Sequence, residues 1–156
     1  MKYIELRPEH KRRCVKTHGD ALNILDPGRH YRVGVGHQWT YRLSNGEIAH
    51  FCWAEGPPNL WSKDGPRWVY ADPLTGPGVG PRSKANRKES LKLLQNAMRQ
   101  RTCVRCVVVD GHKQANFILD VPTDLRGCVR CADEQAGITI VFEIQGDERS
   151  RLTLDD

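Results

Sequence analysis

The feature that most constrains the fold is a tetrad, CVRC, that occurs twice, beginning at Cys103 and at Cys128. Together the four cysteines have the spacing C-x2-C-x21-C-x2-C. A structural zinc ion takes four ligands in a tetrahedron, and each C-x2-C turn can supply two thiolates. The pattern therefore predicts a Zn²⁺ site formed by Cys103, Cys106, Cys128 and Cys131.

The segment between and after the tetrads has the pattern of three strands. "VVVDG" and "ANFILDV" read as a hairpin that turns near Gly111, and "ITIVFEI" reads as a further strand after the second tetrad. Residues 101–145 thus resemble the zinc-ribbon class of four-cysteine modules. Such ribbons usually place glycine after the second cysteine of each pair, whereas Val107 and Ala132 stand there in this chain.

A zinc-free alternative is open at the same residues. "TCVRCVVV" also reads as plain strand, in which the cysteines are small core hydrophobes. Successive side chains of a strand alternate between faces, so a C-x2-C pair in a strand directs its thiols to opposite sides. A regular strand and a shared metal site therefore exclude each other, and the strand alternative predicts a structural or interaction protein.

"CVRCVVVDGHKQAN" followed by "LRGCVRC" also resembles the recombination endonuclease VII family. This resemblance implies a ββα-type nuclease in which Asp110 binds a catalytic divalent ion and His112 activates the attacking water. The family motif is Asp-His-x-His, and Gly111 occupies the place of its first histidine. A strand pattern also follows where the family has a helix, so we keep catalysis as an alternative, and the first hypothesis requires no enzyme activity.

Charge is concentrated in one segment. The chain has a net charge of +5, and residues 82–105 hold eight basic residues against Glu89 alone. Basic patches attract polyanions through release of counterions, which predicts a nucleic acid (DNA or RNA) or a nucleic-acid-associated protein as partner. The predicted contact residues are Lys88, Lys92, Arg99, Arg101 and Arg105.

Most of this basic segment has the periodicity of a helix. Asn86 and Glu89 fit an N-cap with its reciprocal partner, and Leu91, Leu94 and Met98 form the apolar stripe. Lys88, Lys92 and Arg99 lie on another face at helical spacing. The pattern predicts a helix that buries one side and presents a basic ridge on the other.

Three further predictions concern residues 1–81. Pro8 and Gly19 bound a helix that would place His10, Cys14 and His18 on one face. Alternation in "YRVGVGHQWTYRL" and "EIAHFCWA", with "SNG" between them, predicts an antiparallel hairpin over 30–54. Residues 56–81, with five glycines and six prolines, predict a loop that contains the short strand "RWVYA".

Composition bounds the class of protein. At 156 residues, 38% hydrophobic and 28% charged, the chain suits a globular domain with a polar surface, and it has neither a signal-peptide core nor a membrane-spanning run. We therefore expect a cytoplasmic α+β protein with no membrane partner. Its predicted parts are a β-rich antiparallel region (1–81), then a basic helix and a three-stranded zinc-ribbon-like module (82–156).

Overall fold

The computed structural model describes residues 1–31, 38–56, 59–74, 84–110 and 117–145. Within them the chain has an α+β fold, as the sequence predicts. The elements in chain order are α1 (Tyr3–Leu6), α2 (His18–Leu25), β1 (Thr40–Arg42), β2 (Ile48–Trp53), β3 (Trp61–Asp64), β4 (Arg67–Asp72), α3 (Lys84–Gln100), β5 (Val104–Val109), β6 (Ile118–Asp120), β7 (Leu125–Asp133) and β8 (Gly137–Ile144).

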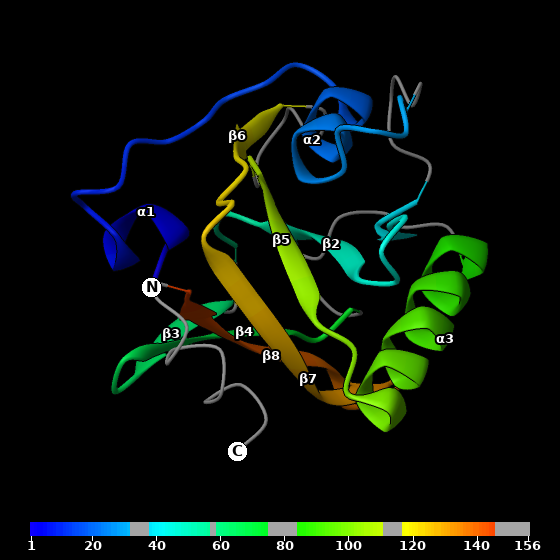
Figure 1. Ribbon diagram of the computed structural model, residues 1–156. Helices are drawn as coiled ribbons and strands as arrows, with labels where there is room; N and C mark the ends of the chain where they lie inside the picture. The colour runs from blue at the N-terminus through cyan, green and yellow to red at the C-terminus, as the bar shows by residue number, and fades with distance from the viewer. Residues whose placement is uncertain (32–37, 57–58, 75–83, 111–116, 146–156) are drawn as a thin grey trace.

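The strands form one sheet in the order β1-β2-β5-β7-β8-β4-β3, with β6 paired to β5 (Figure 1). The sheet thus joins strands from both sides of the predicted boundary at residues 81 and 82. Most neighbours are antiparallel, but β2 and β5 run parallel from Ile48↔Val104 to Trp53↔Val109. All six residues of β5 are buried, which is typical of a parallel strand covered on both faces.

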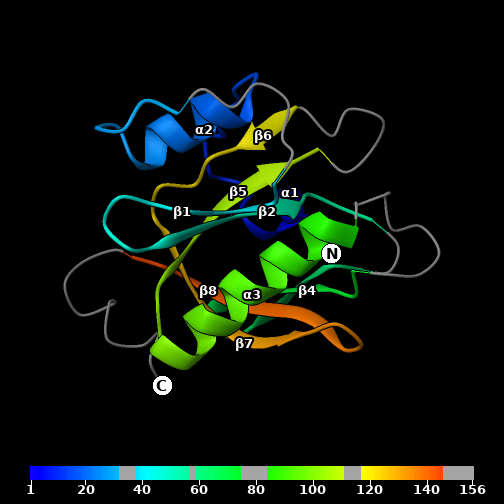
Figure 2. The same cartoon turned by 90° about the vertical axis from the view of Figure 1, so that its right-hand side faces the viewer.

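Alternation along β2 and β5 supplies two hydrophobic cores on opposite faces of the sheet. Cys106 and Val108 belong to the core that includes Leu91 and Leu94 of α3. Val107 and Val109 belong to the core that includes Leu22 of α2. The two helices therefore pack on different faces of this part of the sheet, and Figure 2 shows α3 lying in front of β7 and β8.

The predicted hairpins are confirmed where they are described. β1 and β2 pair antiparallel around the "SNG" turn, although residues 32–37 of the predicted first strand lie outside the described residues. "RWVYA" forms β4, which pairs with β3 inside the predicted loop and with β8 on its other side. β5 pairs with β6, and "ITIVFEI" lies in β8.

The helix predicted from Pro8 is wrong. Residues 8–16 contain no helix, since the backbone of Arg13 donates to Asp120 (2.9 Å) and Val15 pairs as an isolated bridge with Ile118. These contacts require an extended segment. His10 therefore does not share a helix face with Cys14 and His18; His18 begins α2 and stacks on Phe51 with ring centroids 4.1 Å apart.

Close packing explains Gly127, the glycine of the "LRGCVRC" stretch. A Cβ atom there would lie 2.5 Å from Cε1 of Phe142 on the neighbouring strand β8. Gly137, at the β7–β8 turn, has a positive φ of 87°, and a Cβ atom there would meet the carbonyl oxygen of Asp72 at 2.3 Å. The absence of a side chain at Gly127 and Gly137 thus allows β7, β8 and β4 to pack closely.

Candidate functional site

Helix α3 turns one face to the core and the other to solvent. Leu91, Leu94 and Ala97 are buried, and the side-chain amide of Gln95 donates to the carbonyl oxygen of Ala132 in β7 (3.1 Å). Met98 is 38% exposed, so its predicted place in the buried stripe is wrong. Ala97, which is 1% exposed, belongs to the core on this side of the sheet instead.

The basic residues of α3 occupy the exposed side, as the ridge prediction requires. Lys88, Lys92 and Arg99 are all exposed, and Arg101 is exposed directly after the helix ends. Arg101 has a positive φ of 54°, the left-handed conformation in which helices often end. These four residues form what we call the α3 basic ridge.

Arg105, the fifth predicted contact residue, does not join the ridge. It is 7% exposed in β5, where its guanidinium lies 3.3 Å from a carboxylate oxygen of Glu47 and donates to the carbonyl oxygen of Thr123 (3.1 Å). A buried, paired guanidinium cannot reach a phosphate on the surface. Its burial follows from β5 being covered on both faces.

A hollow lies on each side of α3. Toward the β7–β8 turn, a groove of about 600 Å³ is lined by Lys88, Lys92, Gln95 and Leu91 together with the acidic residues Glu89, Asp133 and Glu134. Three carboxylates face the two lysines, so this groove has a negative balance. The positive charge of the ridge therefore lies on the exposed surface of α3 and not in this groove.

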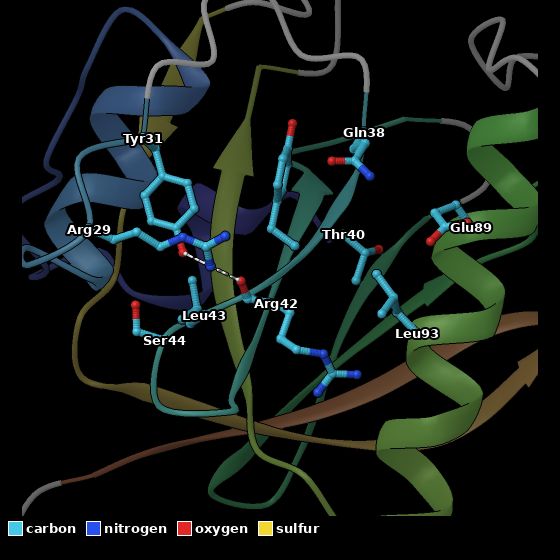
Figure 3. Close-up of a pocket in the computed structure, with 10 residues that line it drawn as sticks. Arg29, Tyr31, Gln38, Thr40, Arg42, Leu43, Ser44, Glu89 and Leu93 are labelled. Atoms are coloured by element: carbon cyan, nitrogen blue, oxygen red, sulfur yellow. Dashed lines mark hydrogen bonds between the residues drawn. The ribbon is translucent and has the colours of Figure 1, made fainter.

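Toward β1, a cavity of about 620 Å³ has a different lining (Figure 3). We call it the β1 cavity, and its walls come from the segment before β1, from β1 itself and from α3. The lining residues are Arg29, Tyr31, Gln38, Thr40, Tyr41, Arg42, Leu43, Ser44, Glu89 and Leu93. Figure 3 shows the Arg42 side chain extending from β1 toward α3.

Sequence reasoning missed the β1 cavity, although part of the signal was present. Alternation places Arg42 on the face of its strand opposite to Tyr41 and Leu43, and the structure confirms this, since Arg42 is exposed and its two neighbours are buried. Nothing in the local pattern indicates that α3, more than forty residues later, would close the other wall. The cavity depends on tertiary packing.

The four cysteines lie in or next to two strands of the sheet, not in separate knuckles. Cys106 is fully buried in β5 among the core residues next to α3, whereas Cys103 precedes that strand. Cys128 and Cys131 are half-buried in β7. Among the described residues, no group of three or more histidine, cysteine, aspartate or glutamate side chains is placed to hold a metal ion, so a zinc ribbon is not confirmed.

The environment of Cys103 favours the neutral thiol. Burial and the nearby Glu47 carboxylate raise the pKa of Cys103 to about 12, although Arg126 opposes the effect. A cysteine that acts as a free thiolate nucleophile needs the opposite shift. In this arrangement Cys103 is a packed thiol beside the Glu47 carboxylate and the Arg126 guanidinium.

Asp110, from the nuclease alternative, lies directly after β5, and its backbone N–H donates to the carbonyl oxygen of Phe117 (3.0 Å) as the chain returns toward β6. His112 and Gly111 lie outside the described residues. In the described part of the chain beyond Gln100 every regular element is a strand. The helix that a ββα-metal site requires is therefore not among them.

No protein-family model and no curated protein matches the chain. Among solved structures, the chain is similar to a crystal structure of SUVH5 SRA in complex with fully methylated CG DNA, at 13% identity and a TM-score of 0.36 over 85% of this chain and 87% of that one. A TM-score this low supports no conclusion about fold or function. In the described residues, no helix has the length and apolar character to cross a membrane.

Proposed function

We propose that this protein binds nucleic acid through the α3 basic ridge. The observation that supports the proposal is the division of α3 into two faces, with Leu91, Leu94 and Ala97 buried while Lys88, Lys92 and Arg99 are exposed. A helix fixed on a sheet in this way holds its cations at fixed positions along one exposed face. Such a row can follow a phosphate backbone and release its counterions.

The proposed contacts are to phosphates and carry no sequence preference by themselves. Lysine and arginine contacts to phosphate position a protein on nucleic acid, whereas sequence is read from base edges. We therefore expect binding to several sequences with similar affinity. The proposal requires neither zinc nor catalysis; zinc binding by the four cysteines and the nuclease alternative stay predictions that separate measurements test.

The test is fluorescence anisotropy with labelled duplex DNA, single-stranded DNA and RNA at several salt concentrations. We expect log K to fall linearly with log salt, with a slope of about −0.9 for each duplex phosphate that is contacted. The variant K88E/K92E/R99E should lose at least about tenfold in affinity and reduce that slope. Its melting temperature should stay close to that of the unmodified protein, because all three side chains are exposed.

A matched control separates a local site from net charge. The variant K11E/K16E/K63E makes the same change in net charge at exposed lysines outside α3. We expect it to keep most of the affinity. Equal losses in the two triple variants, or no binding of any nucleic acid by the unmodified protein at low salt, would overturn the proposal.

A further inference from the structure

The β1 cavity contains two arginines that form no salt bridge with any described residue, Arg29 and Arg42. Both residues are exposed. Glu89 supplies the acidic group of the lining, so the cavity has a positive balance. Neither guanidinium forms a salt bridge with a described carboxylate, although the Asp26 charge behind the cavity wall interacts with Arg29, and such a pair of cations is suited to an anionic ligand.

Arg29 is fixed in place before any ligand binds. Its guanidinium carbon lies 4.9 Å from the ring centroid of Tyr31, which is a cation–π contact. Nη1 of Arg29 donates to the hydroxyl of Tyr31 (3.3 Å) and to the main-chain carbonyl of Arg42 (3.1 Å), and Figure 3 shows both partners at the cavity wall. Within the described residues these contacts use only Nη1, so Nη2 and Nε keep their donor capacity.

A carboxylate behind the wall holds Tyr31 in turn. Oδ2 of Asp26 accepts hydrogen bonds from the Tyr31 hydroxyl (2.9 Å), the Ser44 hydroxyl (2.7 Å) and the Ser44 backbone N–H (2.9 Å). The Ser44 hydroxyl, then the Ser44 backbone, hold the pKa of Asp26 below its usual range. Asp26 is therefore ionised at neutral pH, and its charge orients the tyrosine on which Arg29 stacks.

We propose that the β1 cavity binds a phosphate ester, with the phosphate held between the guanidinium groups of Arg29 and Arg42. Guanidinium groups match phosphate oxygens with paired, charge-assisted hydrogen bonds, and preorganisation of one of them lowers the entropic cost of binding. At about 620 Å³ the cavity has room for more than the phosphate. The attached group would lie against Leu93, within reach of the exposed polar side chains of Gln38 and Glu89.

The cavity proposal rests on the proposed function in one respect, the source of the phosphate ester, which would be the nucleic acid bound by the ridge. Lys88 and Lys92 of the ridge and Leu93 of the cavity lie on different sides of α3, so a strand that crosses the helix from the ridge reaches the cavity. The phosphate is then a backbone diester. A free nucleotide would bring a phosphate monoester to the same two arginines.

The experiment compares Arg42→Gln with the control Arg13→Gln by isothermal titration calorimetry on the full chain. Arg42→Gln tests the cavity because the Arg42 side chain is exposed, and the hydrogen bonds from Arg29 and Tyr31 are accepted by its main-chain carbonyl, which the substitution keeps. The melting temperature should therefore stay unchanged. The probes are an oligonucleotide without terminal phosphates, a nucleoside monophosphate and inorganic phosphate. Arg42→Gln should weaken binding at least about tenfold and Arg13→Gln less than about twofold.

The probes distinguish the two sources. A loss confined to the oligonucleotide supports a backbone diester, and a loss that includes the monophosphate supports a free or terminal monoester. Unchanged affinity of Arg42→Gln for all three probes would overturn the cavity proposal, while leaving the ridge to its own test. If K88E/K92E/R99E binds nucleic acid normally and Arg42→Gln does not bind the monophosphate, the ridge proposal fails and the cavity stands.

Discussion

The hydroxyl of Tyr3 donates a 2.5 Å hydrogen bond to the carboxylate of Asp120, 117 residues away in sequence. Asp120 is fully buried at the end of β6, and Tyr3 is 1% exposed. The same carboxylate is contacted by Nε2 of His10 (2.8 Å) and accepts from the backbone N–H of Arg13 (2.9 Å). The buried carboxylate of Asp120 thus holds three residues of the N-terminal segment against β6.

Replacing Tyr3 by phenylalanine should lower the free energy of unfolding by about 1.5–3 kcal/mol, since it removes a hydrogen bond to a buried charged group. Urea denaturation of the full chain measures this. The matched control is Tyr31→Phe, whose lost hydroxyl also bonds a carboxylate, that of Asp26. Each carboxylate keeps two other contacts, but Asp120 is fully buried whereas Asp26 is half-buried. We expect a smaller loss there; equal losses would show that burial of Asp120 adds nothing.

A second contact of the N-terminal segment, the ion pair of Arg7 with Asp124, should stabilise the fold by an amount that depends on pH. Arg7 donates two hydrogen bonds to Asp124, at 3.0 and 2.5 Å, and its side chain is 9% exposed. Burial raises the pKa of Asp124, but the hydrogen bonds and the charge of Arg7 more than offset it, so the net shift is downward. A carboxylate with a lowered folded-state pKa stabilises the fold above its unfolded pKa of about 3.9, and this is lost as pH falls through the folded pKa.

The measurement is a double-mutant cycle with Arg7→Gln and Asp124→Asn, followed from about pH 7 to about pH 2 by chemical denaturation. The cycle is needed because Arg7 also lies over the Trp68 ring at 5.5 Å, and a single variant would lose both contacts. We expect a coupling energy of about 1 kcal/mol at neutral pH that declines only below about pH 4. A coupling that stays constant to about pH 2 would contradict the assignment to Asp124.

The sequence predicted those helices and strands that depend mainly on residues near one another in the chain. The β1–β2 hairpin follows from alternation and a turn, and α3 follows from its apolar stripe. The exposed positions of Lys88, Lys92 and Arg99 could be predicted for the same reason, since helical spacing decides which residues share a face.

Long-range pairing could not be predicted from the same patterns. The burial of Arg105 depends on β5 joining β2, a strand fifty residues earlier, as a parallel neighbour. Pro8 and Gly19 are placed as residues that begin and end a helix. Between them, however, the backbone of Arg13 bonds the Asp120 carboxylate and Val15 pairs with Ile118, so the segment is extended. In both places a contact distant in sequence outweighs the local preference.

The four cysteines offer a test in which the zinc hypothesis and the observed sheet give different results. If all four hold one zinc ion, each serine variant should lose the metal and unfold the module to a similar extent, since binding energy at such a site is folding energy. In the sheet the cysteines differ in environment, because Cys106 is fully buried whereas Cys128 and Cys131 are half-buried in β7.

From the sheet we expect the serine variants to rank by burial. Cys106→Ser should cost about 1–3 kcal/mol, because it places a hydroxyl in an apolar core, while Cys131→Ser should cost less than about 0.5 kcal/mol. Urea denaturation with and without a chelator, together with metal analysis of the purified protein, measures both effects. Similar losses in all four variants, with loss of one equivalent of zinc in each, would contradict the ranking and establish the metal site, because four thiolates with unequal burial become equivalent only when they share one ion.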